Sequence, residues 1–472
     1  MIFSSFPFIF LFLPLTIIGY FQLSRFVSFY WAKVFLVAAS LFFYGYWNPV
    51  YVVLIVGSCL VNFKLGSWLT PTPTRDPTAR RRLLFITVAG NLAMLGFFKY
   101  CNFIIFNFNF LAGHTFDYLE IVLPLAISFF TFQQIAFLVD SYRGSVKEYD
   151  LVNYFLFVTF FPQLIAGPIV HHSEVIPQFE NETNRHVNYD HLSAGLYLFS
   201  IGLFKKVVLA DSLSLFVGAG YDTTANLTIV EAWIVALSYT FQLYFDFSGY
   251  TDMGLGAARM FNIDLPQNFL SPYKSLNIQE FWRKWHITLS RWLSNYLYIP
   301  LGGSRLGKWL TYRNLMITFL LGGLWHGAGW TFVLWGFLHG LATVIHRIWK
   351  GTAIQMPKWL AWFITFQFVN AAWVFFRAPD LKSAGRIFKG MLGLSGSVGM
   401  NSFISIATMD RYLYLFFLIL SGVLVLFWPN SMEKSKNLSY RAASIVSIVL
   451  LVSVSLLFLN SSTPKEFLYF DF

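Results

Sequence analysis

The sequence predicts an all-α polytopic membrane protein. Hydrophobic residues make up 57% of the 472 residues and charged residues only 12%, whereas a soluble domain carries about 25% charged residues. The apolar residues form long runs that recur from one end of the chain to the other. Because lipid offers a backbone no hydrogen-bond partners, such runs are expected to be α-helices.

The runs differ in length, and several are shorter than the ~20 residues that cross a bilayer. The first has no basic segment before it and no small-residue cleavage site, so it is predicted to be a retained span and not a signal peptide. We expect about 10 to 12 crossings, with the shorter runs forming half-helices or re-entrant segments inside protein. Pro162 and Gly167-Pro168 are predicted to break one run into such a re-entrant hairpin. The runs lie near 5–23, 33–47, 50–69, 83–98, 119–139, 151–170, 192–210, 228–247, 312–323, 330–349, 358–376, 411–428 and 442–459.

Basic residues predict how the chain is oriented in the membrane. The loop over 70–83 holds four arginines against one acid, Asp76, and short loops rich in Lys and Arg stay on the cytoplasmic side. The N-terminus is therefore predicted to lie outside. This rule is also the main explanation of the net charge of +11, and an attraction for anionic donors is the weaker alternative.

Two segments are predicted to be helices of another kind. Residues 381–392 place apolar side chains on one helical face and basic ones on the other, so this segment should lie in the membrane interface after an N-cap at Asp380. Residues 277–298 also have helical periodicity, with Arg283 and Lys284 on the outer side. They are predicted to form one partly buried helix that turns His286 toward protein.

Two histidines stand in very apolar sequence, each directly after a tryptophan, as Trp285-His286 and Trp325-His326. An ionisable ring at membrane depth is costly and needs a functional or a pairing reason, and imidazole accepts and returns a proton near neutral pH. His326 is predicted to act as a general base or proton relay, with Gly327 allowing close approach. The alternative is a hydrogen-bonded interhelical histidine, and for His286 a structural role is equally open.

Asp246 ends an aromatic, hydrophobic run and is a third candidate. A carboxylate there should pair with a cation or become neutral. Structural pairing with Lys205, Lys206 or an arginine is favoured over the orientation of a histidine, which is the role of the acid in catalytic triads. No metal-ligand spacing occurs in the sequence, because His171-His172 are adjacent and no cysteine or carboxylate cluster joins them.

Several motifs resemble the membrane-bound O-acyltransferase (MBOAT) superfamily. The segments that carry the resemblance are Arg283-Lys-Trp-His286 and Leu324-Trp-His-Gly327. Further stretches resemble its bacterial polysaccharide O-acetyltransferase branch, typified by the membrane subunit of alginate O-acetyltransferase. They run in order over essentially the whole chain and include Phe160-Phe-Pro-Gln-Leu-Ile-Ala-Gly-Pro168, Phe204-Lys-Lys-Val-Val-Leu-Ala-Asp211, Phe245-Asp-Phe-Ser-Gly-Tyr-Thr-Asp252 and Trp373-Val-Phe-Phe-Arg-Ala378.

The resemblance implies a helix bundle around a central tunnel, in which a cytoplasmic acyl thioester meets an acceptor from the other side. His326 matches the invariant catalytic histidine of the family. His286 matches its second signature position, which is Asn in eukaryotic relatives. Trp282, Trp285 and Trp325 are expected to line or support the tunnel and to exclude water, because hydrolysis is the competing reaction.

The predicted function is therefore that of an O-acyltransferase. It would move an acetyl group from a cytoplasmic donor, acetyl-CoA, across the membrane for O-acetylation of an extracytoplasmic polysaccharide. An SGNH-type periplasmic or extracellular partner is expected to complete the transfer, and no permanently bound cofactor is expected. The whole chain, 1–472, is expected to form one integral domain of a bacterial inner membrane. The alternatives are D-alanyl transfer, a transporter or flippase without covalent chemistry, and a scaffold without turnover.

Overall fold

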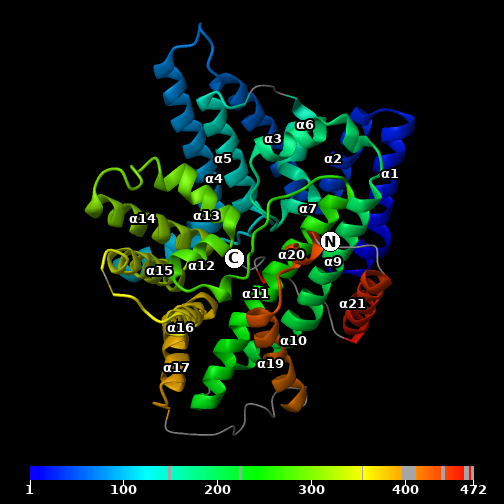
Figure 1. Cartoon of the computed structure of the whole chain (residues 1–472). Helices are drawn as coiled ribbons and strands as arrows, with labels where there is room; N and C mark the ends of the chain where they lie inside the picture. Colours follow the sequence, from blue (N-terminus) through cyan, green and yellow to red (C-terminus); the bar gives the residue numbers. More distant parts are fainter. Residues whose placement is uncertain are drawn as a thin grey trace. The chain divides into compact units, whose positions relative to one another are not determined.

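The computed structural model of the chain is helical (Figure 1). It describes residues 1–113, 115–146, 150–222, 226–352, 354–395, 411–436, 442–461 and 467–468, and no β-strand occurs among them. The all-α class predicted from the apolar runs is confirmed.

The chain divides into two compact units, each of which is described by itself. Unit 1 consists of Met1–Ser200, Tyr250–Gln267 and Leu438–Ile448. Unit 2 consists of Ile201–Gly249, Asn268–Asn437 and Val449–Phe472. The single domain expected over 1–472 stays a prediction. Both predicted catalytic histidines belong to unit 2.

Unit 1 is an assembly of helices, most of which coincide with predicted apolar runs. Its elements are η1 (Phe8–Phe12), α1 (Leu13–Phe26), α2 (Phe29–Gly45), α3 (Val50–Leu69), α4 (Pro77–Ala112), α5 (Ile127–Arg143), α6 (Leu151–Thr159), α7 (Phe161–Leu164), α8 (His172–Glu180), η2 (Glu182–Arg185), most of α9 (Tyr189–Phe204), the end of α11 (Ile229–Met260) and the beginning of α21 (Ala442–Ser461).

The predicted break in the run 151–170 is present. Helix α6 ends at Thr159, the short α7 carries Pro162 in its first turn, and the chain then leaves the helical conformation until α8. At Gly167 an added Cβ would collide with the backbone of Gln163, so only glycine fits this bend. The entry of this hairpin into the membrane from one side stays a prediction.

The prediction of a helix from 119 is wrong at its beginning. Helix α5 starts only at Ile127, and the residues described before it are not helical. Pro124 lacks a backbone N–H, and Ala126 adopts a left-handed conformation with φ of 63°. Because of these two residues, the helix begins about two turns later than predicted.

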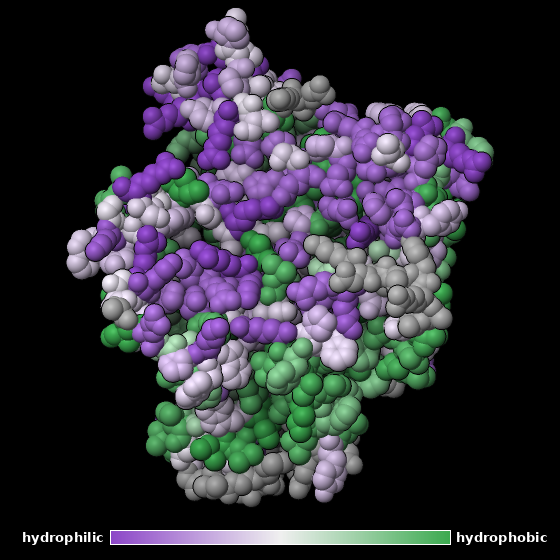
Figure 2. All heavy atoms as spheres, viewed as in Figure 1, coloured by the Kyte–Doolittle hydropathy of each residue, from purple (hydrophilic) through white to green (hydrophobic). Residues whose placement is uncertain are grey.

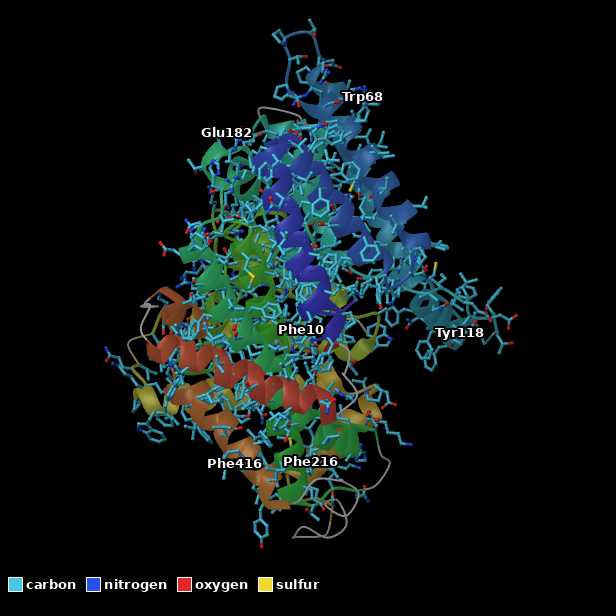
Figure 3. The ribbon with its side chains drawn as sticks, turned by 90° about the vertical axis from the view of Figure 1, so that its right-hand side faces the viewer. Phe10, Trp68, Tyr118, Glu182, Phe216 and Phe416 are labelled. Atoms are coloured by element: carbon cyan, nitrogen blue, oxygen red, sulfur yellow. The ribbon has the colours of Figure 1, made fainter. Side chains whose placement is uncertain are left out.

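Helix α4 is the longest element of unit 1, and its 36 residues correspond to about 54 Å. Figure 3 shows Trp68 and Tyr118 at its opposite ends. Both side chains are exposed, by 47% and 56%, as in the aromatic belts at membrane surfaces. At the Trp68 end, the Arg80 guanidinium donates to the carbonyl oxygens of Leu69 (2.9 Å) and Tyr142 (2.6 Å) and so closes the basic loop onto the helix ends.

Unit 2 contains the remaining helices, and Figure 2 shows apolar side chains gathered over α10, the first part of α11 and α19. Its elements are η3 (Lys205–Ala210), α10 (Asp211–Tyr221), the first part of α11 (Ile229–Met260), η4 (Pro272–Lys274), α12 (Ile278–Lys284), α13 (Ile287–Leu293), η5 (Ser294–Tyr298), α14 (Lys308–His326), α15 (Trp330–Trp349), α16 (Lys358–Arg377), α17 (Leu381–Met391), α19 (Arg411–Phe427), α20 (Ser431–Lys436) and part of α21 (Ala442–Ser461).

The single helix predicted over 277–298 is wrong. The chain forms α12 and α13 instead, because Trp285 is extended and His286 has φ of 42° between them. Periodicity is the same on both sides of such a break, so a pattern of apolar residues does not reveal it.

The amphipathic helix predicted over 381–392 is confirmed as α17. The Asp380 carboxylate accepts from the Ser383 backbone N–H at 2.7 Å, as expected of an N-cap. Ala384 and Ile387 are buried, whereas the Arg386 guanidinium donates to the Gly220 carbonyl at 2.9 Å. Within unit 2 the helix is therefore packed through its apolar face and tied by its basic face, and its place in the membrane interface stays a prediction.

Six described helical segments are long and apolar enough to cross a membrane, namely Phe8–Phe26, Val50–Leu69, Pro77–Ala112, Tyr189–Tyr221, Trp330–Trp349 and Lys358–Arg377. Three shorter apolar helices are Phe29–Gly45, Leu415–Phe427 and Ile445–Asn460. These helices support a multi-pass membrane protein. The predicted 10 to 12 crossings are more than the six described segments that satisfy the criteria of length and composition, and this number stays a prediction.

Candidate active site

The junction between α12 and α13 positions His286. The Asn268 carbonyl accepts from the Ile287 N–H at 3.0 Å, and the Asn268 side-chain oxygen accepts from the N–H (3.2 Å) and the hydroxyl (2.6 Å) of Thr288. The preceding extended segment therefore satisfies the first amides of α13 and holds the reversal at His286 in place. A non-glycine residue at positive φ persists where its surroundings fix it in this way.

His286 is completely buried, and its ring packs edge-on against Phe247 at 4.7 Å between centroids. It lies outside the candidate membrane spans, and burial lowers the pKa of its imidazole to about 3. At neutral pH the ring is therefore uncharged. It is suited to donating a hydrogen bond and poorly suited to taking up a proton.

His326 is the last residue of α14, and the α14–α15 pair places it. At Gly323 an added Cβ would collide with the Phe332 carbonyl oxygen, and at Gly336 with the Phe319 carbonyl oxygen. The two helices thus touch backbone to backbone, as small residues allow. Gly327 follows His326 and lies against the Phe332 ring, which leaves no room for a side chain.

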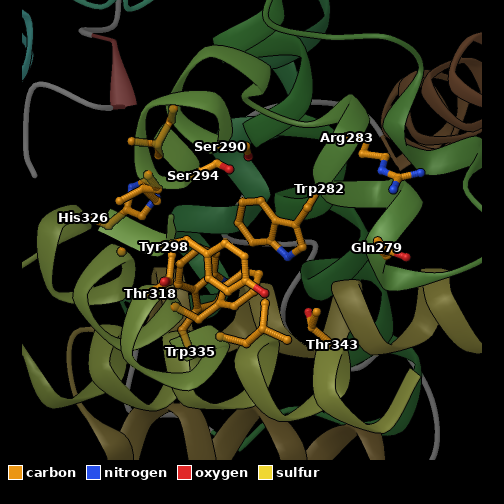
Figure 4. Close-up of a pocket in the computed structure, with 15 residues that line it drawn as sticks. Gln279, Trp282, Arg283, Ser290, Ser294, Tyr298, Thr318, His326, Trp335 and Thr343 are labelled. Atoms are coloured by element: carbon orange, nitrogen blue, oxygen red, sulfur yellow. The ribbon is translucent and has the colours of Figure 1, made fainter. Parts of the chain in front are cut away.

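A cavity of about 250 Å³ opens beside His326 within unit 2. Figure 4 shows His326 and Arg283 on opposite sides of this cavity, with the Trp282 indole between them. Its wall is mostly apolar but includes hydroxyl, amide and guanidinium groups. The lining residues are Gln279, Trp282, Arg283, Leu289, Ser290, Leu293, Ser294, Tyr298, Leu315, Thr318, Phe319, Gly322, His326, Trp335 and Thr343.

Aromatic rings surround the His326 imidazole. Trp335 meets it edge-on at 5.1 Å, Phe376 lies at 5.2 Å and Trp325 at 4.9 Å between centroids. Such walls hold the ring in one orientation. Unlike His286, the His326 imidazole lines the cavity, where it can accept a proton from a hydroxyl held there.

The three tryptophans that were expected to line or support the tunnel differ in their position relative to the cavity. Trp282 lines the cavity, whereas His286, Trp285 and Trp325 are not among the described lining residues. The Trp325 ring contacts His326 at 4.9 Å and His286 at 6.3 Å. It therefore connects the two histidines through packing.

Asp246 has the structural role that the sequence favoured. Its carboxylate pairs with the Lys206 ammonium at 2.6 Å, and Lys206 also reaches Asp211 at 2.8 Å. The backbone N–H of Leu468 donates to Asp246 at 2.9 Å. Buried charges are normally paired in this way, so Asp246 is assigned to an ion cluster apart from the lining of the cavity.

His339 is a buried residue that the sequence analysis missed. It lies in the middle of α15, and its Nδ1 accepts from the Trp282 indole N–H at 3.2 Å. The signal was available, because His339 is an ionisable ring inside an apolar run, as are His286 and His326. Among the described residues, no group of three His, Cys, Asp or Glu side chains is arranged to hold a metal ion.

Comparison with known proteins agrees with these motifs. The model of the MBOAT, membrane-bound O-acyltransferase family matches residues 138–378. The matched region includes His286, His326 and His339 and the helices that carry them.

Relatives match over most or all of the chain. The peptidoglycan O-acetyltransferase of Helicobacter pylori is 45% identical, over 100% of this chain and 98% of that protein. The probable alginate O-acetylase of Pseudomonas aeruginosa is 40% identical, over 83% of this chain and 75% of that protein. The teichoic acid D-alanyltransferase of Bacillus subtilis is 26% identical, over 52% of this chain and 66% of that protein. The resemblance predicted from the motifs is thereby confirmed, and the chain belongs to the membrane-bound O-acyltransferase family.

Proposed function

We propose that the chain takes an acetyl group from acetyl-CoA on the cytoplasmic side and passes it across the membrane for the O-acetylation of an extracytoplasmic polysaccharide. As a member of its family the chain is an acyltransferase. The donor, the direction of transfer and an SGNH-type partner that completes the transfer are parts of the proposal. The polysaccharide acceptor is supported by the relatives named for peptidoglycan and alginate.

The single observation that carries the proposal is the position of His326 at the wall of the cavity. A thioester is already activated, so the protein mainly has to position it and to remove a proton from the attacking hydroxyl. In the proposed step the hydroxyl oxygen bonds to the thioester carbonyl carbon and the carbon–sulfur bond breaks. The His326 imidazole takes the hydroxyl proton and returns it to the leaving thiolate.

The charge of the surrounding sequence supports a polyanionic donor. Between Leu265 and Arg377 the chain has eleven Lys and Arg residues and one acid, Glu280. Glu280 is paired with Lys284 at 2.7 Å. Arg283 lies at the cavity, opposite His326. An excess of positive charge attracts phosphate-bearing donors such as coenzyme A thioesters.

The test uses the full chain in lipid nanodiscs with radiolabelled acetyl-CoA and a hydroxyl-bearing acceptor, since the proposed step requires one. His326→Ala should lower thioester cleavage by about 10²-fold or more, the contribution of a well-placed base. His346→Ala is the matched control, because His346 lies on α15 but does not belong to the described lining of the cavity, and it should cleave at the wild-type rate. Equal cleavage by His326→Ala, with the same thermal midpoint, would remove His326 from the chemistry.

The competing functions give different results in the same assay. D-alanyl transfer predicts no cleavage of acetyl-CoA and turnover of a D-alanyl thioester. A transporter or flippase, or a scaffold without turnover, predicts that the wild type leaves both thioesters intact. When the SGNH-type partner and a glycan are added, the radiolabelled acetyl group should appear on the glycan if the full proposal is correct.

A further inference from the structure

The cavity wall contains a hydrogen bond that the chemistry above does not use. The Trp282 indole N–H, on α12, donates to Nδ1 of His339, on α15, at 3.2 Å. The two rings stand nearly perpendicular, 5.1 Å apart at 81°. Trp282 lines the cavity, and His339 is completely buried behind it. The bond therefore ties a wall of the cavity to the helix that also carries Trp335.

The direction of this bond determines the state of the His339 ring. An indole N–H can only donate, so Nδ1 must accept and the proton of the neutral imidazole must sit on Nε2. Among the described residues, Nε2 has no hydrogen-bond partner. Between ring centroids, Trp335 lies 4.7 Å, Phe368 5.3 Å and Trp373 6.2 Å from His339. Leaving a buried donor without a partner is costly. A purely structural position would be occupied at lower cost by an apolar residue, and among the described residues the bond to Trp282 is the one hydrogen bond that the His339 side chain makes.

Trp282 packs against other side chains of the cavity wall. Its indole packs on Phe319 at 5.3 Å and on Trp335 at 5.7 Å, and both of these side chains also line the cavity. Trp335 in turn contacts the His326 ring edge-on. If the Trp282 indole were free to turn about its χ angles, the cavity beside His326 would change its width.

We propose that His339 is a positioning residue that holds the Trp282 indole as a fixed wall, so that the cavity accepts a short acyl chain and rejects longer ones. The ligand class is thus a thioester of a small acid, and the inference rests on the proposed function. His339 touches no reacting atom in this scheme. Its effect passes entirely through the position of Trp282.

Two isosteric variants separate this role from general packing. In His339→Asn the amide oxygen stands where Nδ1 stood and can still accept from Trp282, whereas in His339→Gln it stands near the position of Nε2 and cannot. Acetyl and butyryl thioesters are compared by kcat/KM in nanodiscs. The wild type and His339→Asn should prefer acetyl, and His339→Gln should lose about tenfold of that preference, the scale of discrimination by a hydrophobic pocket.

Trp282→Phe removes the donor of the same bond and should relax the preference to a similar degree. Combined with His339→Gln it should add nothing further, because both changes break one interaction. His346→Gln, on the same helix, should keep the wild-type preference. Unchanged preference in folded His339→Gln, or equal loss in His339→Asn and His339→Gln, overturns the proposal.

A second readout does not need turnover. With ¹⁵N-labelled tryptophan, the indole signal that disappears in Trp282→Phe reports the bond directly. It should move upfield in His339→Gln and stay in place in His339→Asn. If the wild type cleaves no thioester, the proposed function fails. If the Trp282 indole signal has the same position in the wild type, His339→Asn and His339→Gln, the positioning role fails independently of the proposed function.

Discussion

His286 illustrates how one residue changes the structure of a segment. Its φ of 42° reverses the chain between α12 and α13, a conformation that His and Asn adopt far more readily than β-branched residues. The family resemblance gives Asn at this position in eukaryotic relatives. Both residue types combine tolerance of the left-handed backbone with a polar side chain, which gives a physical reason for their exchange.

The first prediction concerns the backbone at His286. His286→Asn should fold with a thermal midpoint close to that of the wild type, whereas His286→Val should lose about 1–3 kcal/mol, the cost of strain at a left-handed non-glycine residue. The measurement is thermal unfolding in detergent followed by tryptophan fluorescence. If Asn and Val are equally destabilising, the loss comes from the cavity left by the ring and not from the backbone.

At the scale of elements, the site depends on how closely α14 and α15 approach. Their contact runs through Gly323 and Gly336, where the backbone of one helix occupies the space of a side chain on the other. These helices carry His326, Trp335 and His339. The width of the cavity therefore depends on the absence of two Cβ atoms.

Gly336→Ala tests this packing. The new Cβ would meet the Phe319 carbonyl, which is backbone and cannot move away cheaply, so a loss of about 1–3 kcal/mol is expected together with reduced thioester cleavage. Gly96→Ala on α4 is the control, because nothing lies within 4 Å of its added Cβ. That variant should be neutral or more stable by about 0.5–1 kcal/mol. Equal midpoints for the two variants would contradict close packing of α14 on α15.

At the scale of the whole molecule, charge is distributed so as to orient the chain. The basic loop after α3 stands at one end of α4, and the loop that holds Tyr118 stands at the other. Lys and Arg remain on the cytoplasmic side. The N-terminus and the Tyr118 loop are accordingly predicted to face outward, on the side of the acceptor.

Accessibility of single cysteines tests this orientation. In a Cys101→Ser background, Tyr118→Cys should react with a membrane-impermeant maleimide in intact spheroplasts. Thr74→Cys should react only after permeabilisation, because its loop faces the cytoplasm. The reverse labelling pattern would show that the orientation of the chain is opposite to the predicted one, so that the proposed donor and acceptor would lie on the wrong sides of the membrane.

Much of the fold and part of the site follow from local patterns. Apolar runs predicted most helices, Asp380 predicted the start of α17, and Pro162 with Gly167 predicted the break after α6. Each of these features depends on a few neighbouring residues. The start of α5 and the division of 277–298 were missed, because Ala126 and His286 take left-handed conformations that no periodicity requires.

The sequence by itself determined the membrane class and the family, and it made His326 the leading candidate for the chemistry, because composition and short motifs are local properties. Only the tertiary structure decided that Trp282 lines the cavity while Trp285 and Trp325 do not, that Asp246 pairs with Lys206, and that the His339 ring accepts a hydrogen bond from Trp282, 57 residues away. The physical reason is that these relations are fixed by where helices distant in sequence come into contact. Backbone-to-backbone packing and left-handed turns determine those contacts, and neither leaves a periodic signal in the chain.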